Sequence, residues 1–318
     1  LSNIIKRTYQ LSIYLPPAYE TESSKRFPSV YFQDGSEYQS LGSAVNIIDN
    51  LIDSSKIEQV IAVFVRPNDR NDEYAYNNRH NYRQFFVREL VPFIDSLYRT
   101  INKADKRLVL GDSFGGNISA LISLYHPDVF GNCGQQSGAF WPNSYEASTL
   151  LFKGEYKNIK IHSVWGSYEG ELTSDWRMGI DSLKAKGYKF SAKERPEGHS
   201  WGLWRANLDD MLIYFFPNNS SSVIIDNISS PSSFHLRQNY PNPFNPETII
   251  SYSLAEDSHV DLSVYDLLGN EISKLVNSRQ TAGSYNVRFS AAGLSSGIYI
   301  YRLKTDLECF TRKMALIR

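Results

Sequence analysis

The sequence predicts an α/β domain with a mostly parallel sheet, followed by a second, small all-β domain. Up to residue 216, short apolar segments alternate with longer amphipathic ones, whereas residues 234–318 contain only short segments between Gly, Asn and Ser turns. Between them, seven of the residues in 217–233 are Ser, so this stretch buries little and is expected to be a linker. A length of 318 residues also fits two domains.

In the first part, six short apolar runs are candidate strands, and two segments have a helical period. Residues 86–98 carry apolar side chains at helical spacing, and 178–186 does so until Gly187, a typical helix C-terminal residue. Strands that alternate with helices predict a parallel sheet covered on both faces. The candidate strands are 10–15, 29–33, 59–65, 107–110, 161–165 and 190–194.

In the second part, no segment has a helical period. Pro241, Pro243 and Pro246 keep the entry segment out of a sheet ladder, and 266–269 is typical of a hairpin turn. This pattern predicts a small antiparallel sandwich. Its expected strands are 249–254, 260–266, 284–289 and 297–303.

Composition excludes several classes of protein. The formal net charge of −1 argues against nucleic-acid binding. No apolar run exceeds the length of Val60–Val65, far below the roughly 20 residues of a transmembrane helix. Cys133 and Cys309 cannot build a disulfide scaffold or a zinc site, and no phosphate loop or dinucleotide fingerprint occurs, so no metal or other cofactor is expected. The first residue is Leu1, so we expect either a processed chain or a fragment.

The strongest chemical signal is Gly111-Asp112-Ser113-Phe114-Gly115, a G-x-S-x-G motif between an apolar strand and a helical pattern. The motif needs glycines two residues before and after the serine, because the sharp turn brings the backbone close to neighbouring chain. Such a turn exposes the serine hydroxyl at a helix N-terminus, where the amides favour developing negative charge. Ser113 is therefore the predicted nucleophile.

A serine nucleophile needs a base and an acid that orients it, and in this motif's setting the chain order is Ser, then Asp or Glu, then His. His199 lies in a turn after the last predicted strand of the first part and is the predicted base. The acid is expected in the loop after strand 161–165. Glu169 comes first in that loop, and Glu171 and Asp175 remain alternatives.

The expected oxyanion donors are the backbone N–H of Phe114 and that of Gly35 or Ser36, which follow an early strand. Segment 66–83 is rich in Arg, Tyr and Asn and is expected to be a polar loop that overhangs the site. Five side chains are candidates for substrate contact: Arg70, Tyr74, Arg79, Trp141 and Trp201.

Residues 1–216 resemble the esterase family of α/β-hydrolases that includes enterochelin, feruloyl and acetyl-xylan esterases and S-formylglutathione hydrolases. The likeness lies in YLPPAYE (14–20), FQDG (32–35), RNDEY (70–74), ELVPFID (89–95), GDSFGG (111–116), HPDVFGNCGQQSGAFW (126–141) and EGHSWGLW (197–204). It implies a three-layer α/β-hydrolase sandwich that hydrolyses carboxylic esters through an acyl-enzyme, with Ser113, His199 and Glu169 as the triad. Feruloyl or acetyl esters of polysaccharide are the expected substrates. The alternatives are a siderophore ester, or an inactive surface binding protein on the same scaffold.

Residues 234–318 resemble the type A C-terminal sorting domain of the type IX secretion system. The likeness covers FHLRQNYPNPFNPETIISYSL, VDLSVYDLLGNEISKLV, GLSSGIYIYRL and the closing RKMALIR. It implies an Ig-like sandwich that directs export across the outer membrane of a Bacteroidetes-like bacterium. The secretion machinery would then be a partner, with the tail cleaved or linked to the cell surface.

Overall fold

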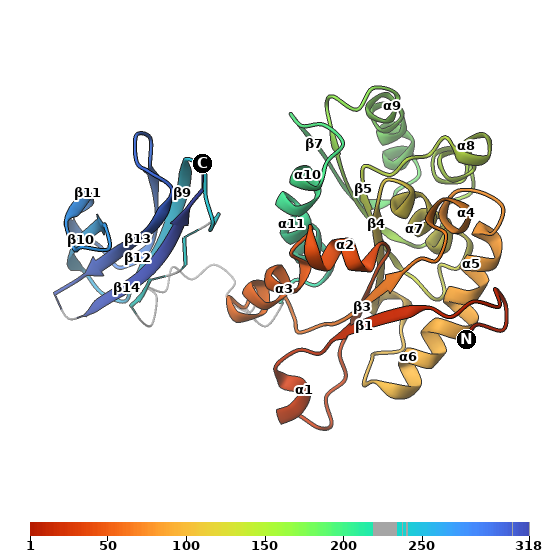
Figure 1. The fold of residues 1–318 in the computed structure, drawn as a ribbon, viewed down its shortest axis with the longest axis horizontal. Coiled ribbons are helices and arrows are strands. Elements are labelled where there is room, and N and C mark those ends of the chain that lie inside the picture. The colour runs from red at the N-terminus through yellow and green to blue at the C-terminus, as the bar shows by residue number, and fades with distance from the viewer. Residues whose placement is uncertain (219–233, 237, 240, 307, 318) are drawn as a thin grey trace. The chain divides into compact units, whose positions relative to one another are not determined.

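The computed structural model describes residues 1–218, 234–236, 238–239, 241–306 and 308–317. It divides the chain into two compact units, Leu1–Val223 and Ile224–Arg318 (Figure 1). Most of the expected linker, 217–233, lies outside the described residues. Its first two residues still belong to the first unit, since Pro217 bridges to Ile57 and Asn218 N–H donates to Lys56 C=O.

The first unit contains one seven-stranded sheet in the order β1-β3-β2-β4-β5-β6-β7. Only the pairing of β1 with β3 is antiparallel, and the other pairs are parallel, which confirms the predicted mostly parallel sheet. The strands are β1 (Gln10–Tyr14), β2 (Ser29–Phe32), β3 (Ile61–Arg66), β4 (Arg107–Asp112), β5 (Asn132–Gln136), β6 (Lys160–Gly166) and β7 (Lys189–Arg195).

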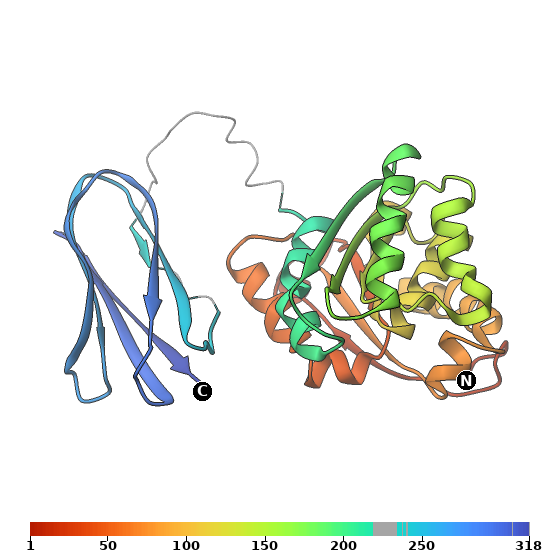
Figure 2. The ribbon, with the colours of Figure 1, turned by 90° about the horizontal axis from the view of Figure 1, so that it is seen from above.

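Helices cover both faces of this sheet (Figure 2). They are α1 (Ala18–Thr21), α2 (Gly35–Ser40), α3 (Ala44–Asp53), α4 (Arg70–Tyr74), α5 (Arg79–Phe85), α6 (Val91–Leu97), α7 (Phe114–Tyr125), α8 (Pro142–Ser148), α9 (Glu171–Ala185), α10 (Trp201–Ala206) and α11 (Leu208–Phe215). Alternate strand residues face opposite cores, as a pleated strand requires. Val63 and Val109 pack with α5, α6, α7 and α9, whereas Phe64 and Leu110 pack with α3, α10 and α11.

Three local expectations need correction. The helix expected at 86–98 starts earlier, with α5, and continues through a π-helical turn at Phe86–Leu90 into α6. The helix expected at 178–186 is the second half of α9. Segment 66–83 is not a loop, because α4 and α5 form there and bury Tyr74 and Tyr82 completely in the core. Although the composition of this segment is polar, the rings of Tyr74 and Tyr82 give it enough apolar surface to pack into the core.

The second unit is an antiparallel β domain with two sheets, in the orders β11-β10-β13-β14 and β12-β9-β8. Asp266 makes the predicted turn between β10 and β11, since its Oδ1 accepts from the N–H groups of Leu268 and Asn270, and Gly269 has a φ of 87°. The strands are β8 (His235–Leu236), β9 (Glu247–Leu254), β10 (Ser258–Tyr265), β11 (Glu271–Gln280), β12 (Gly283–Ser290), β13 (Gly297–Lys304) and β14 (Cys309–Leu316). Of these, β8, β11 and β14 were not among the predicted strands.

Candidate active site

Ser113 sits in a strained turn between β4 and α7. Its φ of 51° and ψ of −118° lie in a region that non-glycine residues rarely occupy, which is typical of a strand-to-helix nucleophile turn. A Cβ on Gly111 would lie 2.5 Å from the carbonyl carbon and oxygen of Gly115, so the glycine is required there. Two backbone hydrogen bonds hold the turn: Ser113 N–H donates to Gln136 C=O (2.9 Å), and Ala139 N–H donates to Ser113 C=O (3.0 Å).

A cavity of about 320 Å³ opens beside Ser113, at the carboxyl ends of the parallel strands. Ser113 and His199 both line it, so the predicted nucleophile and base face the same space. The rings of Trp201 and Trp204 form another part of the lining. The remainder is a charged wall made of Asp34, Glu37, Arg70 and Asp112.

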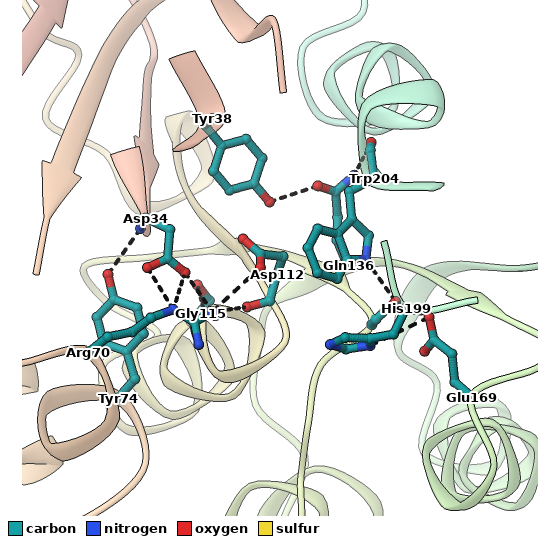
Figure 3. Close-up of polar contacts among 12 residues, drawn as sticks. Asp34, Tyr38, Arg70, Tyr74, Asp112, Gly115, Gln136, Glu169, His199 and Trp204 are labelled. Carbon is teal, nitrogen blue, oxygen red and sulfur yellow. Dashed lines mark hydrogen bonds and ion pairs between the residues drawn. The ribbon is translucent and has the colours of Figure 1, made fainter. Parts of the chain in front are cut away.

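Glu169 lies beside His199 (Figure 3). Its Oε1 is 3.6 Å from His199 Nδ1, and its side chain is 2% exposed, whereas that of His199 is 40% exposed. Glu171 is exposed at the start of α9, and Asp175 lies half-buried within that helix, where burial and then the charge of Glu171 raise its pKa. Among the described residues, an ion pair with His199 is recorded for Glu169 alone of the three candidate acids.

The charged wall is organised by Arg70. Its Nε lies 2.8 and 2.9 Å from the two carboxylate oxygens of Asp34, and its Nη2 lies 3.5 Å from Asp112 Oδ2 (Figure 3). Both carboxyl groups are buried. Burial and the neighbouring charge of Asp34 raise the pKa of Asp112 well above its usual value, and Arg70 opposes that shift. Since one guanidinium serves two carboxyl groups, Arg70 brings little net positive charge to the cavity.

The three expected oxyanion donors are the first residues of two helices. Phe114 begins α7, and Gly35 and Ser36 begin α2, so their N–H groups have no partner within the helix. The residues on either side of that pair, Asp34 and Glu37, both line the cavity. A Cβ on Gly35 would lie 2.5 Å from the Phe64 carbonyl carbon, so the start of α2 packs tightly on β3.

The candidates for substrate contact separate into three groups. Arg70 and Trp201 line the cavity. Tyr74 does not, because its ring is fully buried and its hydroxyl accepts a hydrogen bond from Asp34 N–H (3.0 Å), so its predicted contact with substrate is wrong. Arg79 is paired with Glu146 at 2.7 Å, and Trp141, which is 44% exposed, packs edge-on against Phe114; neither is among the residues that line the cavity.

Ser137, whose hydroxyl donates to Glu169 Oε1 at 2.7 Å, was not among the predicted site residues. The hydrogen bond from the indole N–H of Trp204 to Ser137 Oγ, at 2.9 Å, was not predicted either. Both residues lie within segments that carry the resemblance to esterases, 126–141 and 197–204. No local pattern marks either one, since the contact joins residues 67 positions apart.

Two family models match the chain. The model described as "Putative esterase" matches residues 2–215, which is more than half of the chain. The chain belongs to this esterase family. The model described as "Secretion system C-terminal sorting domain" matches residues 238–317. The sorting domain directs the esterase across the outer membrane, so the protein is secreted or attached to the cell surface. Among the described helices, none is both long and apolar enough to cross a bilayer.

The esterase is similar to curated proteins of two kinds. It is 27% identical over 201 residues to the uncharacterized protein YbbA of Bacillus subtilis, across 56% of this chain and 79% of the relative. It is 28% identical over 215 residues to an endo-1,4-beta-xylanase/feruloyl esterase of Xylanibacter ruminicola, across 63% of this chain and 28% of that longer protein.

Solved structures share the fold at lower identity. A ferulic acid esterase matches with a TM-score of 0.59 and 19% identity, across 68% of this chain and 94% of its own. The enterobactin esterase FES from Shigella flexneri matches with a TM-score of 0.60 and 20% identity, across 67% and 56% of the two chains. At this identity the likeness establishes the α/β-hydrolase fold and does not identify a substrate.

Proposed function

We propose that this exported esterase hydrolyses carboxylic esters with Ser113 as nucleophile, His199 as general base and Glu169 as the acid that orients His199. One observation carries the proposal. Ser113, held in a strained turn, shares a cavity with His199, and the buried carboxylate of Glu169 lies behind His199 Nδ1. Nucleophile, base and orienting acid in this relation are the arrangement that serine hydrolysis requires.

The reaction proceeds in two halves. His199 Nε2 takes the hydroxyl proton as Ser113 Oγ bonds to the ester carbonyl carbon, and the charge on the carbonyl oxygen is held by N–H groups at the starts of α7 and α2. Collapse of this intermediate breaks the bond to the alcohol, which leaves with the proton from His199. Water then attacks the acyl-enzyme with the same assistance, which releases the acid and restores Ser113.

The proposed substrates are feruloyl or acetyl esters of polysaccharide. Export brings the enzyme to polymers outside the cell, and Trp201 and Trp204 give the cavity aromatic surface against which an aryl or sugar ring can stack. The relative from Xylanibacter ruminicola, which is named as a feruloyl esterase, supports this choice.

A siderophore ester is the second candidate, from the resemblance to enterochelin esterases. The charged wall argues against it, because Arg70 is already paired with the carboxyl groups of Asp34 and Asp112, and the exposed carboxylate of Glu37 would repel a polyanionic ferric catecholate. An uncharged feruloyl or acetyl ester meets no such repulsion.

The test begins with p-nitrophenyl acetate and continues with methyl ferulate, acetylated xylan and ferric enterobactin. The wild-type protein should hydrolyse the first three, and Ser113→Ala should lower kcat by about 10⁴-fold or more. Hydrolysis of ferric enterobactin alone among the last three would instead favour the siderophore ester. If no ester is hydrolysed, or if Ser113→Ala retains full activity, the proposed function is wrong.

A further inference from the structure

Two hydrogen bonds and one ion pair link Trp204, Ser137, Glu169 and His199 in a series that ends at the predicted base. Figure 3 labels three of these residues, Trp204, Glu169 and His199. Trp204 Nε1 lies 2.9 Å from Ser137 Oγ, which lies 2.7 Å from Glu169 Oε1, which in turn lies 3.6 Å from His199 Nδ1. The four residues come from α10 and from the loops that follow β5, β6 and β7. The series therefore joins four segments that approach one another only in the folded chain.

The direction of these hydrogen bonds follows from the chemistry of the groups. An indole N–H can only donate, so Ser137 Oγ must accept from Trp204. The single hydrogen of the Ser137 hydroxyl is then free to point at Glu169, and an ionised carboxylate can only accept. Glu169 Oε1 also faces His199 Nδ1, at 3.6 Å, which favours the tautomer with the proton on Nδ1 and leaves Nε2 of the imidazole as the proton acceptor.

Burial makes the Ser137 hydroxyl important to Glu169. Ser137 is fully buried and the side chain of Glu169 is 2% exposed, so water does not compensate for a lost hydrogen bond. Glu169 Oε2 is also buried, and no hydrogen-bond partner for it is found among the described residues. Ser137 and His199 are therefore the two polar groups recorded against this carboxylate, and both contact Oε1.

Trp204 also contacts the His199 imidazole directly. Its ring packs edge-on against the His199 imidazole, with centroids 5.0 Å apart and planes at 89°, which restricts rotation of the imidazole. Two further hydrogen bonds fix the position of Trp204. Gln136 Nε2 donates to the Trp204 carbonyl oxygen, and the Tyr38 hydroxyl donates to Gln136 Oε1, each at 2.7 Å. Ser137 is held by its own backbone, whose N–H donates to Val164 C=O at 2.8 Å.

We propose that Ser137 and Trp204 are positioning residues of the hydrolytic reaction: Ser137 holds the Glu169 carboxylate against His199, and Trp204 orients both Ser137 and the imidazole. This inference rests on the proposed function of Ser113, His199 and Glu169. It assigns neither residue a contact with the reacting atoms.

The test compares Ser137→Ala and Trp204→Phe with a matched control. Ser137→Ala removes the hydroxyl and leaves the backbone preference unchanged, and Trp204→Phe removes the indole N–H while keeping a ring. Ser163→Ala is the control, because Ser163 is another fully buried serine, on β6, whose Oγ has no recorded partner. The measurements are kcat and KM for p-nitrophenyl acetate, the downfield ¹H NMR resonance of the imidazole Nδ1–H, and the thermal unfolding midpoint.

Loss of a hydrogen bond to a charged group predicts a fall in kcat of about 10- to 100-fold for Ser137→Ala, with KM within about twofold because Ser137 does not line the cavity. The Nδ1–H resonance should shift or broaden in Ser137→Ala and Trp204→Phe and stay in place in Ser163→Ala. Wild-type kcat and an unchanged resonance in the folded Ser137→Ala and Trp204→Phe variants would overturn the positioning role. That result, together with an inactive Ser113→Ala, would leave the proposed function standing; an active Ser113→Ala would overturn the function itself.

Discussion

Acidification should destabilise the first unit through His162, a histidine on β6 that the cavity does not use. The side chain is 1% exposed, both ring nitrogens are buried without a recorded hydrogen-bond partner, and the ring packs edge-on against Tyr214. Burial lowers the pKa of His162 from its usual value of 6.5 to about 4, since the charged imidazolium would lose its hydration. In the folded protein the ring is therefore neutral at pH 5, whereas in the unfolded chain it is largely protonated.

The sign and size of the effect follow from this difference in proton binding. Between pH 6.5 and 4 the unfolded state binds the extra proton, so the free energy of unfolding falls as the pH falls through that window. A shift of about 2.5 pKa units, at 1.36 kcal/mol per unit, corresponds to a loss of about 3 kcal/mol over the whole window. Above pH 7, His162 no longer makes the free energy of unfolding depend on pH.

The assay is urea unfolding at pH 7.5, 6, 5 and 4.5, with tryptophan fluorescence as the signal. All five Trp residues precede residue 205, so the signal reports the first unit. His162→Leu, which has a similar volume and no titratable group, should remove most of the slope between pH 6.5 and 4.5. His259→Leu, at an exposed histidine in the second unit, should leave it intact. A slope in His162→Leu equal to that of the wild type would refute the reasoning.

Three further outcomes are expected. Gly111→Ala should destabilise the first unit by more than about 2 kcal/mol and abolish ester hydrolysis, because the added Cβ meets the backbone of Gly115. Urea unfolding measures the loss of stability, and kcat measures the loss of hydrolysis. Asp112→Asn should stabilise the protein at pH 8, because burial raises the pKa of Asp112 and the wild type therefore loses stability as the pH rises above the usual carboxyl pKa of 3.8, where the unfolded chain releases its proton more readily than the folded chain. Equal stability of the two proteins at pH 8 would contradict this. A chain that ends at Asn218 should keep the unfolding midpoint and kcat of the full chain, since each unit has its own core; insolubility or loss of activity would count against it.

The parts of the fold that the sequence predicted are those whose cause is local. Strands β2, β3 and β4 are buried on both faces and are correspondingly apolar, so a short run of residues contains the whole signal. The turn at Ser113 was predictable for the same reason, because the steric need for Gly111 and Gly115 arises within five residues. The antiparallel second unit was predictable from alternation and from the Asp266 turn.

The missed elements depend on partners elsewhere in the chain. Strand β5 has the polar sequence NCGQQ, yet Gln135 and Gln136 are fully buried. Gln136 is tolerated there because its amide bonds both Tyr38 and Trp204, from α2 and α10. Likewise, Tyr74 is buried in the core because its hydroxyl meets Asp34 N–H. A pattern analysis that scores side chains one at a time assigns these residues to the surface.

The choice among the three candidate acids shows the same limit at the site itself. Position in the loop favoured Glu169 but left Glu171 and Asp175 open, since Glu171 follows only two residues later. The fold separates them: Gly170, with a φ of 62°, ends the loop, and Glu171 becomes the first residue of α9. The loop that retains Glu169 then packs against the turn after β7, where Tyr168 N–H donates to Glu197 C=O two residues before His199. Because β6 and β7 are adjacent parallel strands, the loops at their carboxyl ends must meet, so the contact between Glu169 and His199 is a consequence of strand order.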